Sequence, residues 1–148
     1  MSIIYLDTSA FVKQYVQETG SREVQKLILA ADHVGTSLIT RAEMAAALSR
    51  AARVKILPAS EAHATWNQFL EDWSSLSRLN VSRQIIDRAA MLAWDFALRG
   101  YDAVHLASAV LWQETLEAGI TLATFDGELW SAANKAGLSV WPENLPAK

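Results

Sequence analysis

The sequence predicts an α/β fold with a central parallel sheet and helices on both of its faces. Short strand-like runs alternate with longer amphipathic segments across short connections. Strands and helices that alternate in this way form parallel sheets, because each helix returns the chain to the start of the next strand. The chain has 148 residues, 51% of them hydrophobic, and no cysteine. We therefore expect residues 1–148 to form one domain without disulfide bonds.

Four strands are expected. The first, Ile3–Leu6, is apolar at every position and stops at Asp7, a pattern typical of a strand that is buried on both faces. Three later short runs are assigned as strands in the same way, at 34–37, 120–124 and 138–141, the last of them ended by Pro142.

The segments between the strands have helical periodicity. We expect helices over 9–16, 21–31, 40–54, 60–76, 82–98, 101–116 and 128–135. Ser60 is the expected N-cap residue of the first of the two helices within 60–98. The second is expected to run from Ser82, with Gly100 as its C′ residue. The two helices within 60–98 are the one irregularity, an insertion into the alternation.

An aromatic stripe runs along the helix over 60–76, where Trp66, Phe69, Leu70 and Trp73 recur at helical spacing. Such a stripe most simply packs into the core. If part of it were exposed, it would offer a hydrophobic groove to a partner segment or to a second subunit. The sequence leaves both possibilities open.

The charge of the chain limits how it can meet nucleic acid. Thirteen Lys and Arg residues stand against sixteen Asp and Glu residues, a formal net charge of −3. This excludes a uniformly basic surface, so such contacts need a local basic patch or bound metal ions. The N-terminus lacks the basic segment of a signal peptide, and no apolar run reaches the roughly 18 residues of a membrane span. We expect a cytoplasmic protein without membrane contacts.

Four acidic residues are expected at one edge of the sheet, where parallel α/β folds bind their ligands beyond the carboxyl ends of the strands. Asp7 directly follows the first strand, and Glu43 lies in the first turn of the helix after the second. Asp126 lies just beyond the third strand, and Asp102 opens the helix over 101–116. Because clustered carboxylates repel one another strongly, we interpret these acids as a site for hard divalent cations.

Oxygen ligands of this kind suit Mg²⁺, for which Mn²⁺ can substitute. One or two such ions would turn an acidic pit into a receptor for phosphate and supply an activated water for attack on phosphorus. The hydroxyls of Ser9 and Thr124, each two residues from an acid, are placed to orient a carboxylate or a metal-bound water. Alternatively, Ser9 is a helix N-cap.

Each acid also has an ordinary structural explanation. Thr40 and Glu43 have the spacing of a capping box, Asp102 suits the dipole at its helix start, and Asp126 can form a turn with the next glycine. Asp7 fits such an explanation least, because burying a carboxylate at a strand end costs free energy unless it has a partner. The convergence of all four on one edge favours the metal site.

Three other enzyme classes do not match the sequence. A phosphatase of the haloacid dehalogenase type needs a second Asp at the position of Ser9, and a response-regulator receiver needs a later phospho-acceptor Asp followed by a Lys. A serine hydrolase needs a G-x-S-x-G turn, which does not occur.

Four segments, in this order, resemble the PIN-domain nucleases, and specifically the small VapC-like toxins of bacterial and archaeal toxin–antitoxin pairs. They are Ile4–Ser9, Thr40–Glu43, Tyr101–Ala109 and Thr124–Leu129. The segment Tyr101–Ala109 is the most specific of them. The length of the chain and the order of its elements match this family over nearly the whole sequence.

The resemblance implies a magnesium-dependent endoribonuclease with a PIN-like three-layer α/β/α sandwich and a parallel sheet of the 3-2-1-4-5 type. It implies an RNA substrate, a cognate antitoxin protein and a homodimer. It also assigns roles to six side chains, with Asp7 and Asp102 as principal metal ligands, Glu43 and Asp126 completing the catalytic quartet, and Ser9 or Thr124 supporting it. The alternative is a catalytically inactive PIN-like module that binds RNA or a protein partner.

His105 lies three residues after Asp102 and therefore on the same face of its helix. This position would suit a metal ligand or a general base. Because the surrounding helix is nearly all apolar, we expect a buried, hydrogen-bonded histidine instead.

Four basic residues, Arg41, Arg50, Arg53 and Lys55, lie in a segment whose only acid is Glu43. Because their helix begins at the predicted site, they are candidates for contacting RNA phosphates. A solvated helix face explains them equally well.

Overall fold

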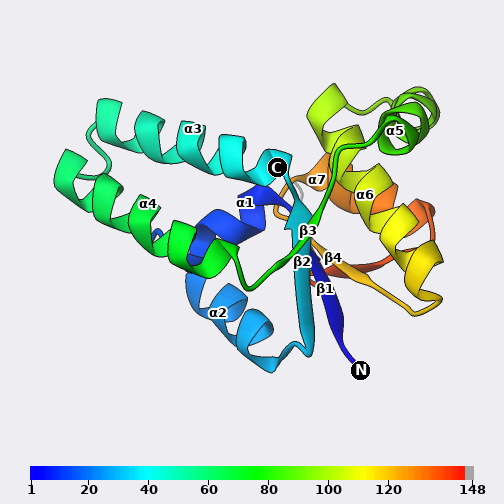
Figure 1. Ribbon diagram of the computed structural model, residues 1–148, viewed down its shortest axis with the longest axis horizontal. Helices are drawn as coiled ribbons and strands as arrows, with labels where there is room; N and C mark the ends of the chain where they lie inside the picture. Colours follow the sequence, from blue (N-terminus) through cyan, green and yellow to red (C-terminus); the bar gives the residue numbers. More distant parts are fainter. Residues whose placement is uncertain (146–148) are drawn as a thin grey trace.

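The structure is a computed structural model that describes residues 1–145, and within them a five-stranded parallel sheet forms the centre (Figure 1). Its strands are β1 (Ile3–Leu6), β2 (His33–Ser37), β3 (Ser77–Leu79), β4 (Thr121–Ala123) and β5 (Ser139–Trp141). They lie in the order β3-β2-β1-β4-β5, and every neighbouring pair is parallel. The predicted α/β class and the strand order implied by the resemblance are confirmed.

Helices cover both faces of the sheet and complete a three-layer sandwich (Figure 1). One face carries α1 (Thr8–Phe11), the short 3₁₀ helix η1 (Val12–Gln14), α2 (Ser21–Ala30), α3 (Ile39–Arg53) and α4 (Ala59–Trp73). The other face carries α5 (Arg83–Phe96), α6 (Gly100–Leu116) and α7 (Gly127–Lys135). The predicted helix over 9–16 is thus divided into α1 and η1. No helix within residues 1–145 is long and apolar enough to cross a bilayer.

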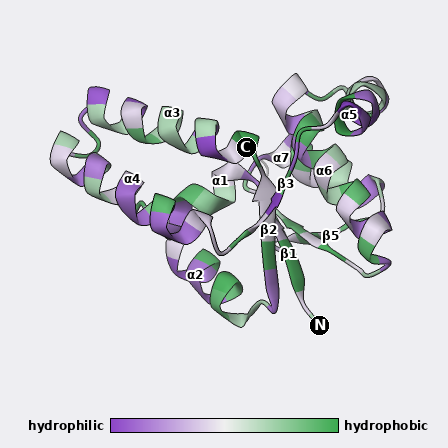
Figure 2. Ribbon diagram, in the orientation of Figure 1, coloured by the Kyte–Doolittle hydropathy of each residue, from purple (hydrophilic) through white to green (hydrophobic). Residues whose placement is uncertain are grey.

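Strand β1 contributes to two hydrophobic cores. Ile3 and Tyr5 pack with α5, α6 and α7, whereas Ile4 and Leu6 pack with α1, α3 and α4. Successive side chains of a strand point to opposite faces, so a strand covered on both sides must be apolar throughout. Figure 2 accordingly shows β1 mostly in the green of hydrophobic residues. The uninterrupted apolar run also brings Asp7, the next residue, to the buried edge of the sheet.

The aromatic stripe of α4 belongs to the core between α4 and the sheet. Phe69 and Trp73 are buried, and Trp66 and Leu70 are half-buried against the same cluster. The Phe69 ring lies 5.6 Å from that of Phe11 and 5.3 Å from that of Trp73, between centroids. Of the two possibilities left open by the sequence, packing into the core is the one observed, although Trp66 also borders a groove between α3 and α4.

Strand β3 was missed by the prediction of four strands. Its residues, Ser77–Leu79, are mostly exposed at the edge of the sheet and lack the apolar pattern that marks the other strands. Hydrogen bonding to β2, with Gly35 opposite Ser77, places them in the sheet. The segment 60–98 is therefore not an irregular pair of helices, because β3 separates α4 from α5 and the alternation continues.

Two helix ends differ from the prediction. The helix expected to run from Ser82 is α5, and Ser82 is its N-cap, where its hydroxyl accepts a hydrogen bond from a backbone N–H. Ser60 is not an N-cap, because α4 already begins at Ala59 after the extended residue Pro58. Gly100 is not the C′ residue of α5, because Ala97 takes the left-handed conformation that ends this helix, and Gly100 instead begins α6.

Gly35 allows α6 to pack closely on β2. A Cβ atom at this position would lie 2.5 and 2.7 Å from atoms of the Trp112 ring and 3.1 Å from the Ser77 carbonyl oxygen. Gly35→Ala is expected to lower the free energy of unfolding by about 1–3 kcal/mol, because the overpacked ring must move. Denaturant unfolding measures this change.

The matched control is Gly119→Ala, since a Cβ at Gly119 meets nothing within 4 Å. Its effect should stay within about 0.5 kcal/mol, as for other unhindered surface changes. Equal stability of the two variants would show that α6 does not depend on the missing side chain at position 35.

Candidate active site

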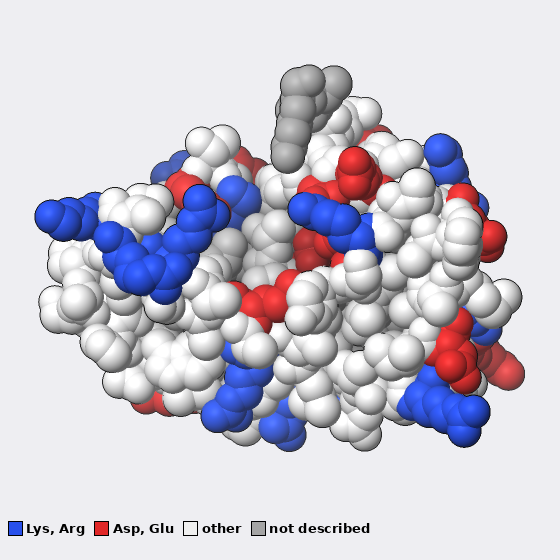
Figure 3. All heavy atoms as spheres, turned by 90° about the horizontal axis from the view of Figure 1, so that it is seen from above, with Lys and Arg blue, Asp and Glu red and all other residues white. Residues whose placement is uncertain are grey.

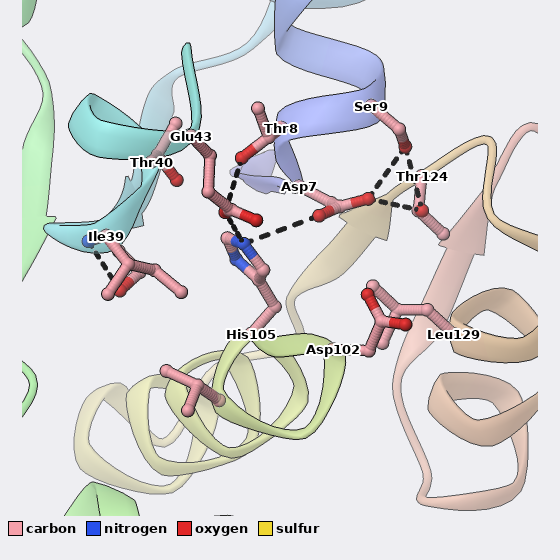
Figure 4. Close-up of polar contacts among 12 residues, drawn as sticks. Asp7, Thr8, Ser9, Ile39, Thr40, Glu43, Asp102, His105, Thr124 and Leu129 are labelled. Atoms are coloured by element: carbon pink, nitrogen blue, oxygen red, sulfur yellow. Dashed lines mark hydrogen bonds and ion pairs between the residues drawn. The ribbon is translucent and has the colours of Figure 1, made fainter. Parts of the chain in front are cut away.

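Asp7 is buried at the carboxyl end of β1 and held by two hydroxyl groups (Figure 4). Its Oδ2 accepts hydrogen bonds of 2.7 Å from both Ser9 Oγ and Thr124 Oγ1. The same two hydroxyls accept from the backbone, Ser9 from the Phe125 N–H and Thr124 from the Asp126 N–H, each at 3.0 Å. These bonds stabilise a buried carboxylate that would otherwise be costly. They also tie the end of β1 to the loop after β4.

Glu43 lies beside Asp7 because His105 bridges the two carboxylates (Figure 4). The Glu43 Oε1 atom lies 2.6 Å from His105 Nε2 and accepts a hydrogen bond of 2.8 Å from Thr8 Oγ1. His105 Nε2 also lies 3.5 Å from Asp7 Oδ1, and Tyr5 Oη lies 2.7 Å from Nδ1. Since ionised carboxylates only accept, Nε2 carries a hydrogen. The expected buried, hydrogen-bonded histidine is confirmed, at 0% exposure.

The electrostatics of this pair favour a charged histidine. Burial by itself would lower the pKa of His105, but the hydrogen bond to Glu43 and the charges of Asp7 and Glu43 outweigh it and raise that pKa. Burial would likewise raise the pKa of Glu43, yet its hydrogen bond and attraction to His105, together with Thr8, lower it. Each group thus stabilises the ionised form of the other.

Asp102 and Asp126 form a second pair, bridged by Arg99. The Asp102 Oδ2 atom accepts from Arg99 Nε at 3.2 Å and Nη2 at 3.1 Å, and Asp126 Oδ2 accepts from Nη2 at 3.0 Å. Asp126 is also the N-cap of α7, where its Oδ1 accepts from the Leu129 N–H. Burial, followed by the charges of Asp126 and Asp7, raises the pKa of Asp102 despite the opposing effect of Arg99. The two pairs are therefore electrostatically coupled.

In each carboxylate the protein holds one oxygen more firmly than the other. Hydroxyl, imidazole or backbone donors hold Asp7 Oδ2, Glu43 Oε1 and Asp126 Oδ1. The partner oxygens are less committed, since Asp7 Oδ1 has the 3.5 Å contact with His105 and Asp126 Oδ2 has the exposed Arg99. Among residues 1–145, nothing donates to Glu43 Oε2 or to Asp102 Oδ1. Oxygens of this kind are available to a ligand.

These acids do not form a closed cage. Within the described part of the chain, no three Asp, Glu or His side chains are gathered into a ready metal-binding group. They stand instead as two pairs, one bridged by His105 and the other by Arg99. The donor chemistry, carboxylate oxygens with uncommitted lone pairs, fits a hard divalent cation such as Mg²⁺. In this arrangement, however, Arg99 holds oxygens of Asp102 and Asp126 that such an ion would use.

A cavity of about 640 Å³ opens beside the quartet, between α5 and the start of α6. Two quartet members reach it, and its other walls are mostly apolar. Its lining includes Glu43, Asp102, Arg99, Tyr101, Ala90 and Ala93. Seen from above in Figure 3, red acidic atoms lie around a hollow in the middle of this face. The acids are therefore accessible from solvent on one side.

The four basic residues predicted as an RNA-binding patch are all exposed, on α3 and in the turn after it. Figure 3 shows blue atoms gathered over the α3–α4 hairpin, beside the acidic hollow. Arg41 lies at the start of α3, whereas Arg50, Arg53 and Lys55 lie toward its far end. A basic strip thus leads away from the site.

Two structural explanations of the site residues are wrong. Thr40 and Glu43 do not form a capping box, because Leu38 is the N-cap of α3 and the Thr40 hydroxyl bonds to that of Thr36 at 2.7 Å. The helix begins at Ile39, so Glu43 falls in its second turn rather than its first. Ser9 is not an N-cap either, because α1 begins at Thr8, with Asp7 in the N-cap position. The Ser9 hydroxyl is used by Asp7.

Sequence analysis missed three side chains of the site. Thr8 donates to Glu43, and Tyr5 is hydrogen-bonded to His105. Arg99 bridges Asp102 and Asp126. Tyr5 lies within the apolar strand and Thr8 directly follows Asp7 at a helix start, so nothing in the pattern distinguishes them. Arg99 did carry a recognisable feature, the i,i+3 spacing to Asp102 that allows ion pairs on a helix.

The chain is similar to known proteins over nearly its whole length. Residues 4–135 match the PIN domain. Ribonuclease VapC45 of Mycobacterium tuberculosis (strain CDC 1551 / Oshkosh) is 36% identical over 148 residues, covering 98% of this chain and 99% of that protein. Ribonuclease VapC46 of Mycobacterium tuberculosis (strain ATCC 25618 / H37Rv) is 31% identical over 140 residues, covering 95% and 97%.

Two solved structures share the fold. FitAcB from Neisseria gonorrhoeae superimposes with a TM-score of 0.68 at 19% identity, covering 95% of this chain and 97% of that one. VapBC-5 from Mycobacterium tuberculosis, a member of the VapBC family of toxin–antitoxin systems, has a TM-score of 0.60 at 23% identity, covering 95% and 96%. From the family match and the two relatives above 30% identity, we conclude that the chain belongs to the PIN-domain family, among its VapC-like members.

Proposed function

We propose that the chain is a divalent-metal-dependent endoribonuclease that acts in the cytoplasm as the toxin of a toxin–antitoxin pair. The proposal rests on four carboxylates that stand beside an open cavity. They form two pairs, Asp7 with Glu43 and Asp102 with Asp126. The relatives above 30% identity are named ribonucleases, which supports RNA as the substrate.

Asp7 and Asp102 would be the principal ligands of Mg²⁺ or Mn²⁺, and Glu43 and Asp126 would complete the set. When bound, such an ion polarises a phosphate and lowers the pKa of a coordinated water, which can then attack phosphorus. The protein's own contribution is orientation. Ser9 and Thr124 fix one oxygen of Asp7, and Thr8 with His105 fixes one oxygen of Glu43, so that the other oxygen of each carboxylate is presented in a defined direction.

His105 has a positioning role in this proposal and is neither a general base nor a metal ligand. It is fully buried, and both of its ring nitrogens are engaged, Nδ1 with Tyr5 and Nε2 with Glu43. A general base must come within hydrogen-bonding reach of the proton that it removes. The ring has no free nitrogen to offer a substrate.

The proposal extends to partners. RNA would approach along the exposed basic residues of α3 toward the acidic pairs, since phosphate contacts from Lys and Arg position nucleic acid. A cognate antitoxin protein would silence the enzyme, and the active form would be a homodimer. The support is the VapC-like membership of the chain and the VapBC-5 structure, which belongs to a toxin–antitoxin family.

Asp7→Asn and Asp102→Asn should each lower RNA cleavage at least about a hundredfold, because losing a metal-binding carboxylate removes several kcal/mol of transition-state stabilisation. A labelled RNA cleavage assay measures this. Both variants should still fold, and Asp102→Asn should change thermal unfolding little, since asparagine is isosteric and relieves repulsion among the acids.

Asp95→Asn is the matched control, because Asp95 is an exposed acid on α5 outside the quartet. It should cleave RNA like the unmodified chain. Loss of cleavage together with loss of folding in the quartet variants would identify the acids as structural. Absence of cleavage by the unmodified chain with metal would favour the inactive binding module.

Removal of divalent ions by excess chelator should stop cleavage, and added Mg²⁺ or Mn²⁺ should restore it. Adding either ion to the metal-free chain should also raise its melting temperature, since a ligand that binds only the folded state stabilises it. Asp102→Asn should abolish most of this thermal shift. Cleavage that persists at full rate in the chelator would contradict the metal-dependent mechanism.

The antitoxin is testable through gene order. A short reading frame that overlaps the upstream end of the gene is expected to encode it. Its purified product should bind the chain and suppress RNA cleavage at a one-to-one ratio of protein chains. Continued cleavage in the presence of a bound upstream product would argue against the toxin–antitoxin assignment.

A further inference from the structure

We propose that Arg99 is an exchangeable RNA-binding residue. It neutralises Asp102 and Asp126 in the metal-free chain, and a bound divalent ion releases it to contact a phosphate of the RNA. This inference rests on the proposed function, because it requires both a metal and an RNA substrate at the quartet.

Arg99 donates its hydrogen bonds to two acids of the site. All three of its side-chain bonds go to the outer pair of acids, from Nε and Nη2 to Asp102 and from Nη2 to Asp126, at 3.0–3.2 Å. The Arg99 side chain is 74% exposed, whereas those of Asp102 and Asp126 are 14% and 20% exposed. The guanidinium therefore covers the acids from the solvent side and is not part of the core.

The two bridging side chains, His105 and Arg99, differ in how firmly they are held. His105 is fully buried and fixed at both ring nitrogens, so it cannot leave Asp7 and Glu43. Arg99 makes exposed ion pairs, which contribute little to stability and are weakened by salt. A divalent ion brings twice the charge to the same oxygens. Of the two bridges, Arg99 is thus the one that an arriving ion displaces.

A released Arg99 side chain would lie at the rim of the site. Arg99 is the N-cap residue of α6, so its backbone is fixed at the rim of the site. It lines the same cavity as Glu43 and Asp102. A guanidinium presents its donors in a planar fork that matches the oxygens of a phosphate. An RNA strand that reaches the quartet through this cavity therefore passes within reach of Arg99.

Arg88 provides a matched control. It pairs with Glu114 on α6 through two bonds of 3.0 and 3.2 Å, and it lies on the neighbouring helix α5. Like Arg99, it is an arginine in a carboxylate ion pair at the surface. Unlike Arg99, it has no contact with the quartet. Arg88→Gln and Arg99→Gln remove the same charge and differ in location.

The first experiment titrates Mn²⁺ into the full chain by calorimetry. Arg99→Gln should bind Mn²⁺ about two- to fivefold more tightly than the unmodified chain, because the ion no longer displaces an exposed ion pair. Arg88→Gln should bind it like the unmodified chain. An Arg99→Gln variant with unchanged Mn²⁺ affinity would overturn the proposal.

The second experiment measures binding of a short single-stranded 2′-O-methyl RNA by fluorescence anisotropy at several salt concentrations, with gels to verify that it stays intact. With Mn²⁺, the logarithm of the RNA association constant falls linearly with log salt. Arg99→Gln should make this negative slope shallower by about 0.7, which corresponds to the loss of one phosphate contact to a single strand. Without Mn²⁺ the slope should not change, because Arg99 is then held by the acids. Arg99→Lys should keep the slope with Mn²⁺.

Two outcomes separate this proposal from the function on which it rests. An unchanged slope for Arg99→Gln in Mn²⁺ would overturn the role of Arg99 while leaving the proposed nuclease intact. If the unmodified chain fails to bind Mn²⁺, or binds it equally well after Asp102→Asn, the metal-dependent function itself falls.

Discussion

Mutual repulsion among the four carboxylates is the constraint on which the rest of the site depends. Asp7, Glu43, Asp102 and Asp126 come from four separate segments, and the parallel sheet brings those segments to one edge. The pKa of Asp102 is raised by its burial and then by the charges of Asp126 and Asp7. The fold must therefore either keep the acids apart or supply positive charge between them. It divides them into two pairs and places a side chain that donates hydrogen bonds in each, His105 in one and Arg99 in the other.

The two pairs are held by different means, because one bridging side chain, His105, is buried and the other, Arg99, is exposed. Asp7 is buried, so its carboxylate needs polar partners: two hydroxyls hold Oδ2, and a buried histidine lies 3.5 Å from Oδ1. Asp102 and Asp126 keep part of their surface in water, as Glu43 does, and share the single exposed Arg99. Outside the quartet thirteen basic residues face twelve acidic ones. The rest of the molecule is thus nearly neutral, and the charge that matters for a ligand is concentrated at this edge.

The sequence predicted those parts that depend on local pattern. The apolar run of β1 and the amphipathic helices follow from burial, and the acids at strand ends follow from the topology of parallel sheets. Strand β3 was not predicted because an exposed edge strand needs no apolar residues and is defined by its hydrogen bonds to β2. The hydrogen-bond partners of the acids were not predicted for a related reason. Tyr5 and His105 lie one hundred residues apart, and only the folded chain brings them into contact.

The difference in burial between the two bridging positions also explains why one is a histidine and the other an arginine. A bridge in the core must satisfy its polar atoms from both sides, and an imidazole between Tyr5 and Glu43 does so with two ring nitrogens. A guanidinium placed there would bury five donors with too few acceptors to satisfy them. At the rim the requirement is reversed, because a bridge with many donors can exchange one acceptor for another at little cost. The burial of each bridging position thus selects the side chain that occupies it.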